Sequence, residues 1–215
     1  MLTKSIRGKV KMIKKETPSF SAKGSKTKEN HEAKKVINII FARETKKHLQ
    51  KIILDAAGIC TTKALIKRGH NPDTIHIPNS NKDEYKLITR KHKNTYFITI
   101  GEFLYNNRNN KVKVGGIHLD YMCTFDFSGY CEPKKDLAII FNNKMLVYGG
   151  VLGITLSPRS NKNGSPFEWI DIGRLFNFIN LLALANGYTI EVLDVGGTYN
   201  NGGPMYTYMF KVHKK

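Results

Sequence analysis

An acid and a tyrosine end a short apolar segment of the chain, and they are the residues best placed for chemistry. Residues 114–125 read VGGIHLDYMCTF, in which the apolar run ends at Asp120 and Tyr121 follows directly. A carboxylate can position an amine, and a tyrosine ring can stack on a flat ligand. We therefore take Asp120 and Tyr121 as candidate catalytic residues. The alternatives are an acid that caps a helix and an aromatic ring that packs in the core.

The elements around this pair are those of a parallel sheet. A second apolar run, VLGITLS at 151–157, follows about two dozen residues later, with Gly149 and Gly150 at its entry. Two buried strands separated by a helix-length insert are typical of a crossover unit, which joins parallel strands. Ligands of such sheets bind at the carboxyl ends of the strands. The spacing therefore predicts that Asp120 and Tyr121 lie at that edge.

The rest of the chain alternates between strand and helix patterns. Thr61 or Thr62 is expected to cap the second helix. Five strand–helix units followed by two consecutive strands predict a three-layer α/β domain. We expect a Rossmann-like sheet of about seven strands, mostly parallel, with a C-terminal β-hairpin. The expected strands are 51–55, 74–77, 95–100, 114–120, 151–157, 188–195 and 205–212. The expected helices are 36–50, 61–67, 81–91, 134–141 and 171–185, with a short helical turn at 103–107.

Length and charge indicate one domain with a basic extension. The 215 residues carry a formal net charge of +18, which favours polyanionic partners such as nucleic acid. Residues 1–35 hold eleven Lys or Arg and three Glu. We expect a flexible basic tail at 1–35 that contacts nucleic acid, and the α/β domain at 36–215. The alternatives are a solubilising leader and a charged surface that reflects a Lys- and Asn-rich coding sequence.

The cysteines and the hydropathy pattern indicate a soluble intracellular protein. Cys60, Cys123 and Cys131 form no CxxC pair, so free thiols are expected. No window approaches the ~20 apolar residues of a membrane span, and lysines interrupt any secretory signal. We therefore expect no membrane association. We also expect no metal site, because His118 has no second histidine at ligand spacing.

This order of elements resembles the fold of class I S-adenosylmethionine-dependent methyltransferases over about residues 37–215. The resemblance implies a seven-stranded sheet whose last strand inserts antiparallel, with S-adenosylmethionine lying across the ends of the first strands. IILDAAG at 52–58 takes the place of the glycine-rich first motif, IHIPN the second strand, TIGEF the third, HLDYMCTF the fourth and GGVLGITLS the fifth.

The resemblance implies the cofactor-binding residues. The family's first motif is an acid followed by closely spaced glycines, and this chain keeps Asp55 and Gly58 with two alanines between them. The second motif ends in an acid that accepts hydrogen bonds from the ribose hydroxyls. Here Asn79 takes that position and can accept one bond. Glu102 would serve the adenine or ribose side. For Asp55 the alternative is an acid that caps the following helix.

The resemblance also places the methyl acceptor. Asp120 would hold the cofactor's ammonium or a substrate amine, Tyr121 and Phe125 would stack on a nucleobase, and Ser157 would face the substrate. Family members that methylate amino groups of DNA carry an Asp/Asn-Pro-Pro-Tyr/Phe segment where this chain reads DYMC, so a base amine is not specifically indicated. Cys123 lacks the preceding proline of cytosine-C5 enzymes. Ordinary packing is the alternative for the aromatic rings.

Two functions follow from these patterns. The first is an S-adenosylmethionine-dependent methyltransferase that acts on nucleic acid. The alternative is a catalytically inactive methyltransferase-like protein that serves as a basic nucleic-acid-binding or assembly component, in a viral particle or a ribonucleoprotein. If the protein is viral, the expected location is the host cytoplasm or nucleus. A nicotinamide dehydrogenase is less well supported, because no GxGxxG follows the first strand.

Overall fold

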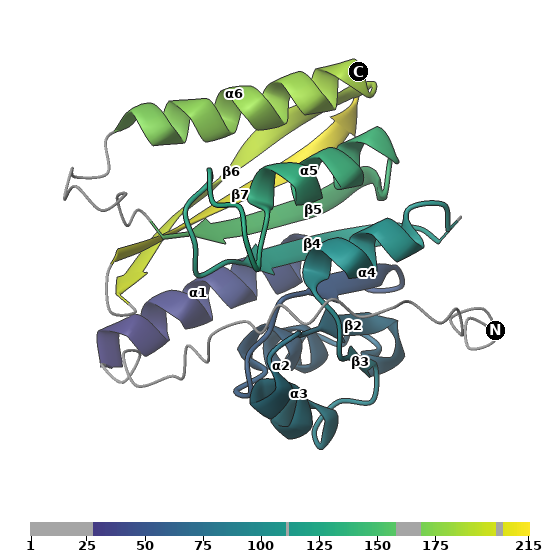
Figure 1. Ribbon diagram of the computed structural model, residues 1–215, viewed down its shortest axis with the longest axis vertical. Helices are drawn as coiled ribbons and strands as arrows, with labels where there is room; N and C mark the ends of the chain where they lie inside the picture. The colour runs from purple at the N-terminus through teal and green to yellow at the C-terminus, as the bar shows by residue number, and fades with distance from the viewer. Residues whose placement is uncertain (1–27, 111, 158–168, 201–203) are drawn as a thin grey trace.

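A seven-stranded mixed sheet forms the centre of the protein, with helices on both faces (Figure 1). The computed structural model describes residues 28–110, 112–157, 169–200 and 204–215. The strand order is β3-β2-β1-β4-β5-β7-β6, in which the first five strands run parallel and β7 inserts antiparallel beside β5. This arrangement confirms the expected three-layer α/β fold with a C-terminal hairpin.

The elements alternate along the chain as expected, with shifted ends. The strands are β1 (Gln50–Ile53), β2 (Ile75–Pro78), β3 (Thr95–Tyr96), β4 (Val114–Asp120), β5 (Leu146–Leu156), β6 (Tyr188–Asn200) and β7 (Pro204–Lys214). The helices are α1 (Lys28–Glu44), α2 (Cys60–Lys67), α3 (Lys82–Thr89), α4 (Ile100–Asn107), α5 (Pro133–Asn142) and α6 (Trp169–Ala185), and a 3-10 turn, η2, spans Pro72–Thr74.

Each face of the sheet packs against its own set of helices. Successive strand residues point to opposite faces, so Ile52 of β1 contacts one core and Ile53 the other. The larger core is formed with α4, α5 and α6, which Figure 1 shows stacked along one face of the sheet. The smaller core is formed with α1, α2 and α3. Burial on both faces explains why the central strands read as continuous apolar runs.

Helix α1 approaches the sheet closely because β4 carries a glycine beneath it. A Cβ atom on Gly116 would lie 2.7 Å from Cγ2 of Thr45, so no larger residue fits there without displacing the helix. One turn earlier on α1, the ring of Phe41 stacks on His118 of β4 at a centroid distance of 5.0 Å. These contacts hold the C-terminal end of α1 against β4.

The expected boundary between tail and domain falls inside a helix. Helix α1 begins at Lys28, whereas the basic composition of residues 1–35 predicted a tail up to residue 35. Residues 28–35 are therefore helical, and the rest of the expected tail lies outside the described residues. Among the residues that the structure describes, no helix is both long and apolar enough to cross a bilayer.

Candidate functional site

A cavity of about 670 Å³ opens at the carboxyl ends of the parallel strands. This volume is within the range of small-molecule binding sites. One wall, here called the strand-end wall, consists of strand ends, the loops after them and the first turns of α3 and α4: 54–58, 79–81, Glu84, 99–100, 120–122 and 130–131. The other, here called the helical wall, consists of residues from α1 and α2: Glu32, Lys34, Lys35, Asn38, Ile39, Cys60, Lys63, Ala64 and Lys67.

Asp55 lines this cavity and also caps α2. Its Oδ2 atom accepts hydrogen bonds from the backbone N–H of Thr62 at 2.9 Å and from the Thr62 hydroxyl at 2.8 Å. Burial raises the pKa of Asp55, and the hydrogen bonds from Thr62 oppose that shift. The capping role was the alternative considered for Asp55. The expectation that Thr61 or Thr62 supplies the cap is wrong, because both residues lie inside α2 and donate to Asp55 instead.

The loop after β1 contains a left-handed backbone conformation at a residue that is not glycine. Helix α2 begins after Ile59, which has φ 45° and ψ 45° and forms no side-chain cap. This left-handed conformation costs an L-residue roughly 1–2 kcal/mol, so glycine is the usual occupant. Ile59 nevertheless stays there because its side chain is buried in the core of α1, α2 and α3. The neighbouring Gly58 is exposed and lines the cavity.

Side chains from the second strand–helix unit hold this loop in place. Asn79 donates from Nδ2 to the carbonyl of Asp55 at 3.1 Å. The carboxylate of Glu84 accepts a hydrogen bond from the Ala57 N–H, and Nζ of Lys91 donates to the Ala57 carbonyl at 2.5 Å. Asn79 and Glu84 both line the cavity. The sequence analysis did not predict Glu84 as a site residue, although Glu84 lies in the first turn of the helix that follows the second strand.

Glu102 is outside the cavity-lining set and belongs to a helix cap. Its Oε2 atom accepts hydrogen bonds from the N–H and the hydroxyl of Thr99, while the Thr99 hydroxyl accepts one from the Glu102 N–H. This reciprocal pair is a capping box at the start of α4. The structure therefore does not bring Glu102 together with Asp55, Asn79 and Asp120, as the sequence had led us to expect.

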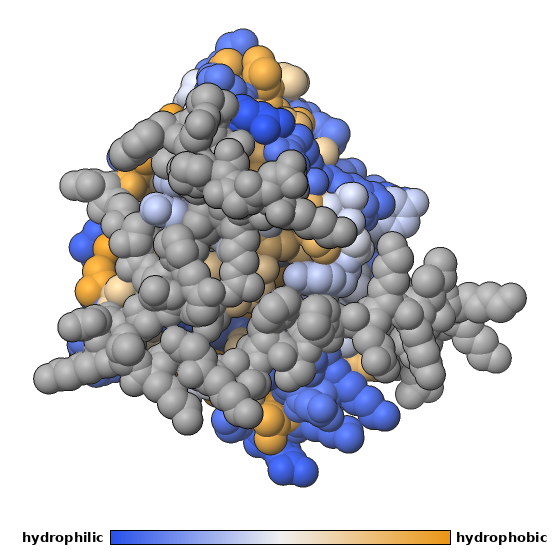
Figure 2. Space-filling model, turned by 60° about the vertical axis from the view of Figure 1, so that its left-hand side comes forward, coloured by the Kyte–Doolittle hydropathy of each residue, from blue (hydrophilic) through white to orange (hydrophobic). Residues whose placement is uncertain are grey.

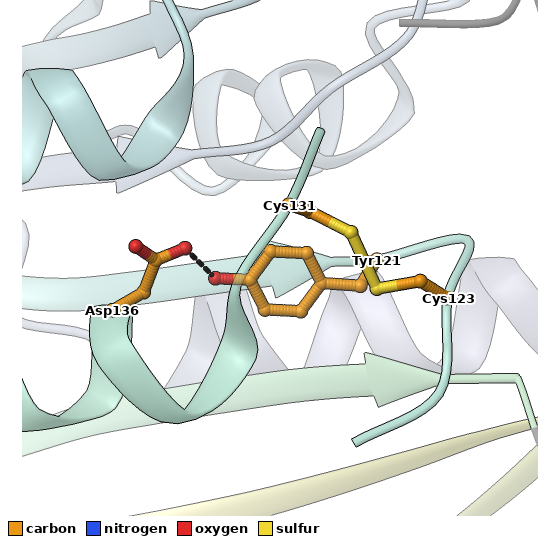
Figure 3. Close-up of a disulfide and its surroundings, with 4 residues drawn as sticks. All are labelled: Tyr121, Cys123, Cys131 and Asp136. Carbon is orange, nitrogen blue, oxygen red and sulfur yellow. Dashed lines mark hydrogen bonds between the residues drawn. A yellow bond between two sulfur atoms is a disulfide. The ribbon is translucent and has the colours of Figure 1, made fainter. Parts of the chain in front are cut away.

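Asp120 and Tyr121 both line the cavity, at the end of β4. The Tyr121 side chain is only 2% exposed, and its hydroxyl donates to Oδ2 of Asp136 at 2.5 Å. Figure 3 shows the ring extending from the side of the Cys123–Cys131 disulfide toward Asp136. Burial raises the pKa of Asp136 to about 6, and burial together with this carboxyl raises the pKa of Tyr121. Such a buried ring is packed rather than open for stacking.

Phe125 and Ser157 lie outside the cavity lining as well. Phe125 is buried in the larger core, where its ring meets Phe178 edge-on at 5.5 Å and Nζ of Lys134 lies 5.0 Å from its centroid. Ser157 is 2% exposed, and its backbone N–H donates to the carbonyl of Cys123 at 3.0 Å. Packing, the alternative considered for Phe125, is what the structure shows.

The loop after β4 is closed by a disulfide between Cys123 and Cys131. The expectation that all three cysteines are free is therefore wrong for this pair, and Cys60 is the free cysteine among the described residues. Spacing could not reveal the bond, because it depends on how the loop folds back onto the sheet. Cys131 and its neighbour Tyr130 line the cavity, so the disulfide holds one end of the loop against the site. Within the described ranges, no group of three or more potential ligands is arranged for a metal ion.

Comparison with known proteins identifies the fold at low sequence identity. No family model and no curated protein sequence matches the chain. The N-methyltransferase NodS from Bradyrhizobium japonicum is 14% identical, with a TM-score of 0.52 and coverage of 86% of this chain and 97% of its own. An rRNA methylase from Streptococcus thermophilus is 12% identical, with a TM-score of 0.52 and coverage of 83% and 96%. The CcbJ methyltransferase from Streptomyces caelestis is 9% identical, with a TM-score of 0.53 and coverage of 85% and 90%. The chain has the class I S-adenosylmethionine-dependent methyltransferase fold.

Proposed function

We propose that the protein is an S-adenosylmethionine-dependent methyltransferase that acts on nucleic acid. The observation that carries this proposal is the open cavity of about 670 Å³ at the carboxyl ends of the strands, in a fold shared with methyltransferases. Three of the four expected cofactor residues, Asp55, Gly58 and Asn79, line it. In a relative that no longer binds a ligand, larger side chains could fill this space, whereas here it is open.

The lining residues fit the chemistry of the cofactor. S-adenosylmethionine is a cation at its sulfonium and ammonium groups, and the strand-end wall offers the carboxylates of Asp55, Glu84 and Asp120 with no lysine or arginine. Asp55, Gly58 and Asn79 would hold it, with Glu84 as the acid of the second unit in place of Glu102. When bound, the cofactor supplies an electrophilic methyl group.

The chain's own residues would then orient the acceptor. Methyl transfer requires in-line positioning and exclusion of water more than it requires a strong base. Asp120 and Tyr121 border the cavity at the end of β4, beside the loop that the disulfide closes. We assign Asp120 to hold an amine of the cofactor or of the substrate. Tyr121 positions this strand end through its bond to Asp136.

The charge of the chain supports a nucleic-acid substrate. The formal net charge is +18, and eleven of the basic residues fall in residues 1–35. Such an excess binds polyanions by releasing their counterions. Removing residues 1–27, which leaves α1 complete, should weaken nucleic-acid binding and reduce its dependence on salt.

A second candidate function is a catalytically inactive relative that binds nucleic acid. The observation in its favour is the loop after β1, where Ala57 and Ile59 stand in a segment that is glycine-rich in the family. Ile59 holds a left-handed conformation there, and its side chain cannot be shortened without loss of core packing. This candidate retains the basic surface but requires no cofactor.

Calorimetric titration with S-adenosylmethionine and S-adenosylhomocysteine separates the two candidates. Ala56 is exposed and lines the cavity, so Ala56→Leu should fill part of the space and weaken binding without disturbing the core. Ala185→Leu, on the exposed end of α6, is the matched control and should bind as the wild type does. If the wild type binds neither compound while it still binds nucleic acid, the enzyme proposal is wrong and the second candidate stands.

A further inference from the structure

The charges that line the cavity are divided between its two walls. All three carboxylates of the strand-end wall, from Asp55, Glu84 and Asp120, lie on one side. The helical wall instead carries four lysines, Lys34, Lys35, Lys63 and Lys67, and a single acid, Glu32. Glu32 is paired with Lys35, whose Nζ lies 3.2 Å from Oε2. The helical wall therefore keeps an excess of positive charge, whereas the charged residues of the strand-end wall are all acids.

Lys63 and Lys67 are the most available of these lysines. They are one turn apart on α2, so both side chains project from the same face of the helix. Both are exposed, and neither forms an ion pair with any residue of the described part of the chain. Figure 2 shows the side of the molecule where the parallel strands end, and hydrophilic side chains gather in its lower part, at the height of α2 and α3 in Figure 1.

We propose that the helical wall is a phosphate-binding face, on which Lys63 and Lys67 hold the sugar–phosphate backbone of an unpaired strand of nucleic acid. This inference rests on the proposed function and names the part of the molecule that carries the substrate. The division of charge is what two ligands of opposite sign require: a cationic methyl donor on the acidic side and a polyanionic acceptor on the basic side.

The cavity also restricts the form of the nucleic acid. A base inside a duplex is stacked and paired, so an enzyme that modifies it must use a single strand or extrude the nucleotide. The two walls belong to one cavity, and phosphates bound along α2 would place the attached base toward the strand-end wall. An acidic peptide could also meet two lysines, but the charge excess of the whole chain favours the longer polyanion.

The experiment compares two double variants with the same spacing and charge change. Lys63→Gln/Lys67→Gln removes the proposed contacts, and Lys82→Gln/Lys86→Gln removes two exposed lysines of α3 that do not line the cavity. Binding of single-stranded RNA and DNA oligonucleotides of about a dozen nucleotides is measured over a range of salt concentrations. For single strands each lost phosphate contact lowers the salt slope by about 0.7, so we expect a fall of about 1.4 for the α2 variant and no change for the α3 variant.

The outcomes separate this inference from the proposed function. Thermal unfolding first checks that both double variants are folded. If their binding then depends on salt with equal slopes, the phosphate-binding face is wrong. That result would leave the proposed cofactor binding by the wild type untouched. A reduced slope for the α2 variant in a protein that binds no S-adenosylmethionine would support the face and overturn the enzyme. Binding of a polyglutamate peptide through Lys63 and Lys67, with no binding of either oligonucleotide, would also overturn the inference.

Discussion

The hydroxyl of Tyr121 donates a hydrogen bond to Oδ2 of Asp136 at 2.5 Å, which ties the end of β4 to the first turn of α5. The same carboxyl group also lies against α4, because a Cβ atom on Gly101 would be 2.7 Å from its Oδ1 atom. Three elements, β4, α4 and α5, therefore meet at one buried acid. Its ionisation should affect both the stability of the fold and the position of the strand end.

The first prediction concerns the pH dependence of stability. Burial raises the pKa of Asp136 to about 6, whereas an unfolded aspartate titrates near ~3.9. Between these pH values the folded protein binds the proton of Asp136 more tightly than the unfolded chain does. The neutral carboxyl group therefore contributes its full stabilisation below about pH 4, and this contribution is lost as the pH rises through about 6. Relative to Asp136→Asn, the wild type should lose on the order of 3 kcal/mol of unfolding free energy over this window, measured by chemical unfolding. Parallel profiles for the two proteins would contradict the assignment.

The second prediction concerns the partner of Asp136. Tyr121→Phe removes the hydrogen bond that lowers the pKa of Asp136, so the pH-dependent loss should move to higher pH. At pH 8 a buried carboxylate without its partner should cost about 1–3 kcal/mol of unfolding free energy. The control is the double variant Tyr121→Phe/Asp136→Asn, in which the shift should be absent. A loss of equal size at every pH would mean that Tyr121 acts through packing alone.

The third prediction separates two roles of Asp55. Asp55→Ala should lower the unfolding free energy by about 1–2 kcal/mol, because Thr61 and Thr62 lose their acceptor at the start of α2. Thr62→Val removes the 2.8 Å hydroxyl bond to Asp55 but leaves the cavity lining unchanged. If cofactor affinity falls in Asp55→Ala and not in Thr62→Val, Asp55 contacts the ligand directly. An equal fall in both would assign its effect to the position of α2.

Much of the fold could be predicted because strand–helix alternation and apolar runs depend on local sequence. Placement of Asp55, Asn79 and Asp120 on one edge also followed, since each lies at or just after the carboxyl end of a parallel strand. The position of Glu102 could have been judged better, because Thr99-Ile-Gly-Glu102 is a readable capping-box pattern. The pattern predicts that the Glu102 carboxylate bonds to Thr99 rather than to a ligand.

Other features of the site depend on tertiary packing that no local pattern reports. Asp136 meets Tyr121 across a loop of the chain, and Cys123 meets Cys131 in the same loop. Lys63 and Lys67 reach the cavity only because α2 is rotated so that Cys60 and Ala64 face it too. Helix rotation about its axis is set by which side chains enter the core, here Leu65.

The fourth prediction is a substitution that should stabilise the fold. Lys144 follows the end of α5 with φ 48° and is exposed. Glycine is the usual residue at this position after a helix, because an L-residue pays a steric cost there. Lys144→Gly should raise the unfolding free energy by about 0.5–1 kcal/mol, whereas Lys144→Ala should not. No gain from glycine in thermal unfolding would show that this turn is not strained.

The fifth prediction follows from Lys51, which is fully buried within β1. Its Nζ donates to the carbonyl of Lys47 at 2.6 Å and to the hydroxyl of Thr74 at 2.9 Å, and burial lowers its pKa to about 8. An unfolded lysine titrates near ~10.4, so between these values the unfolded state binds the proton that the folded state has released. The penalty for burying the charge is therefore present below about pH 8 and is relieved as the pH rises.

Relative to Lys51→Met, the wild type should gain on the order of 3 kcal/mol of unfolding free energy between about pH 8 and pH 10.5. Lys47→Met, at an exposed position, is the control: it retains Lys51 and should therefore gain as much as the wild type over this window. The measurement is chemical unfolding of all three proteins at several pH values. If the wild type and Lys51→Met differ by the same amount throughout, the ammonium group of Lys51 keeps its proton in the folded protein, and the two hydrogen bonds are sufficient to retain a buried charge in β1.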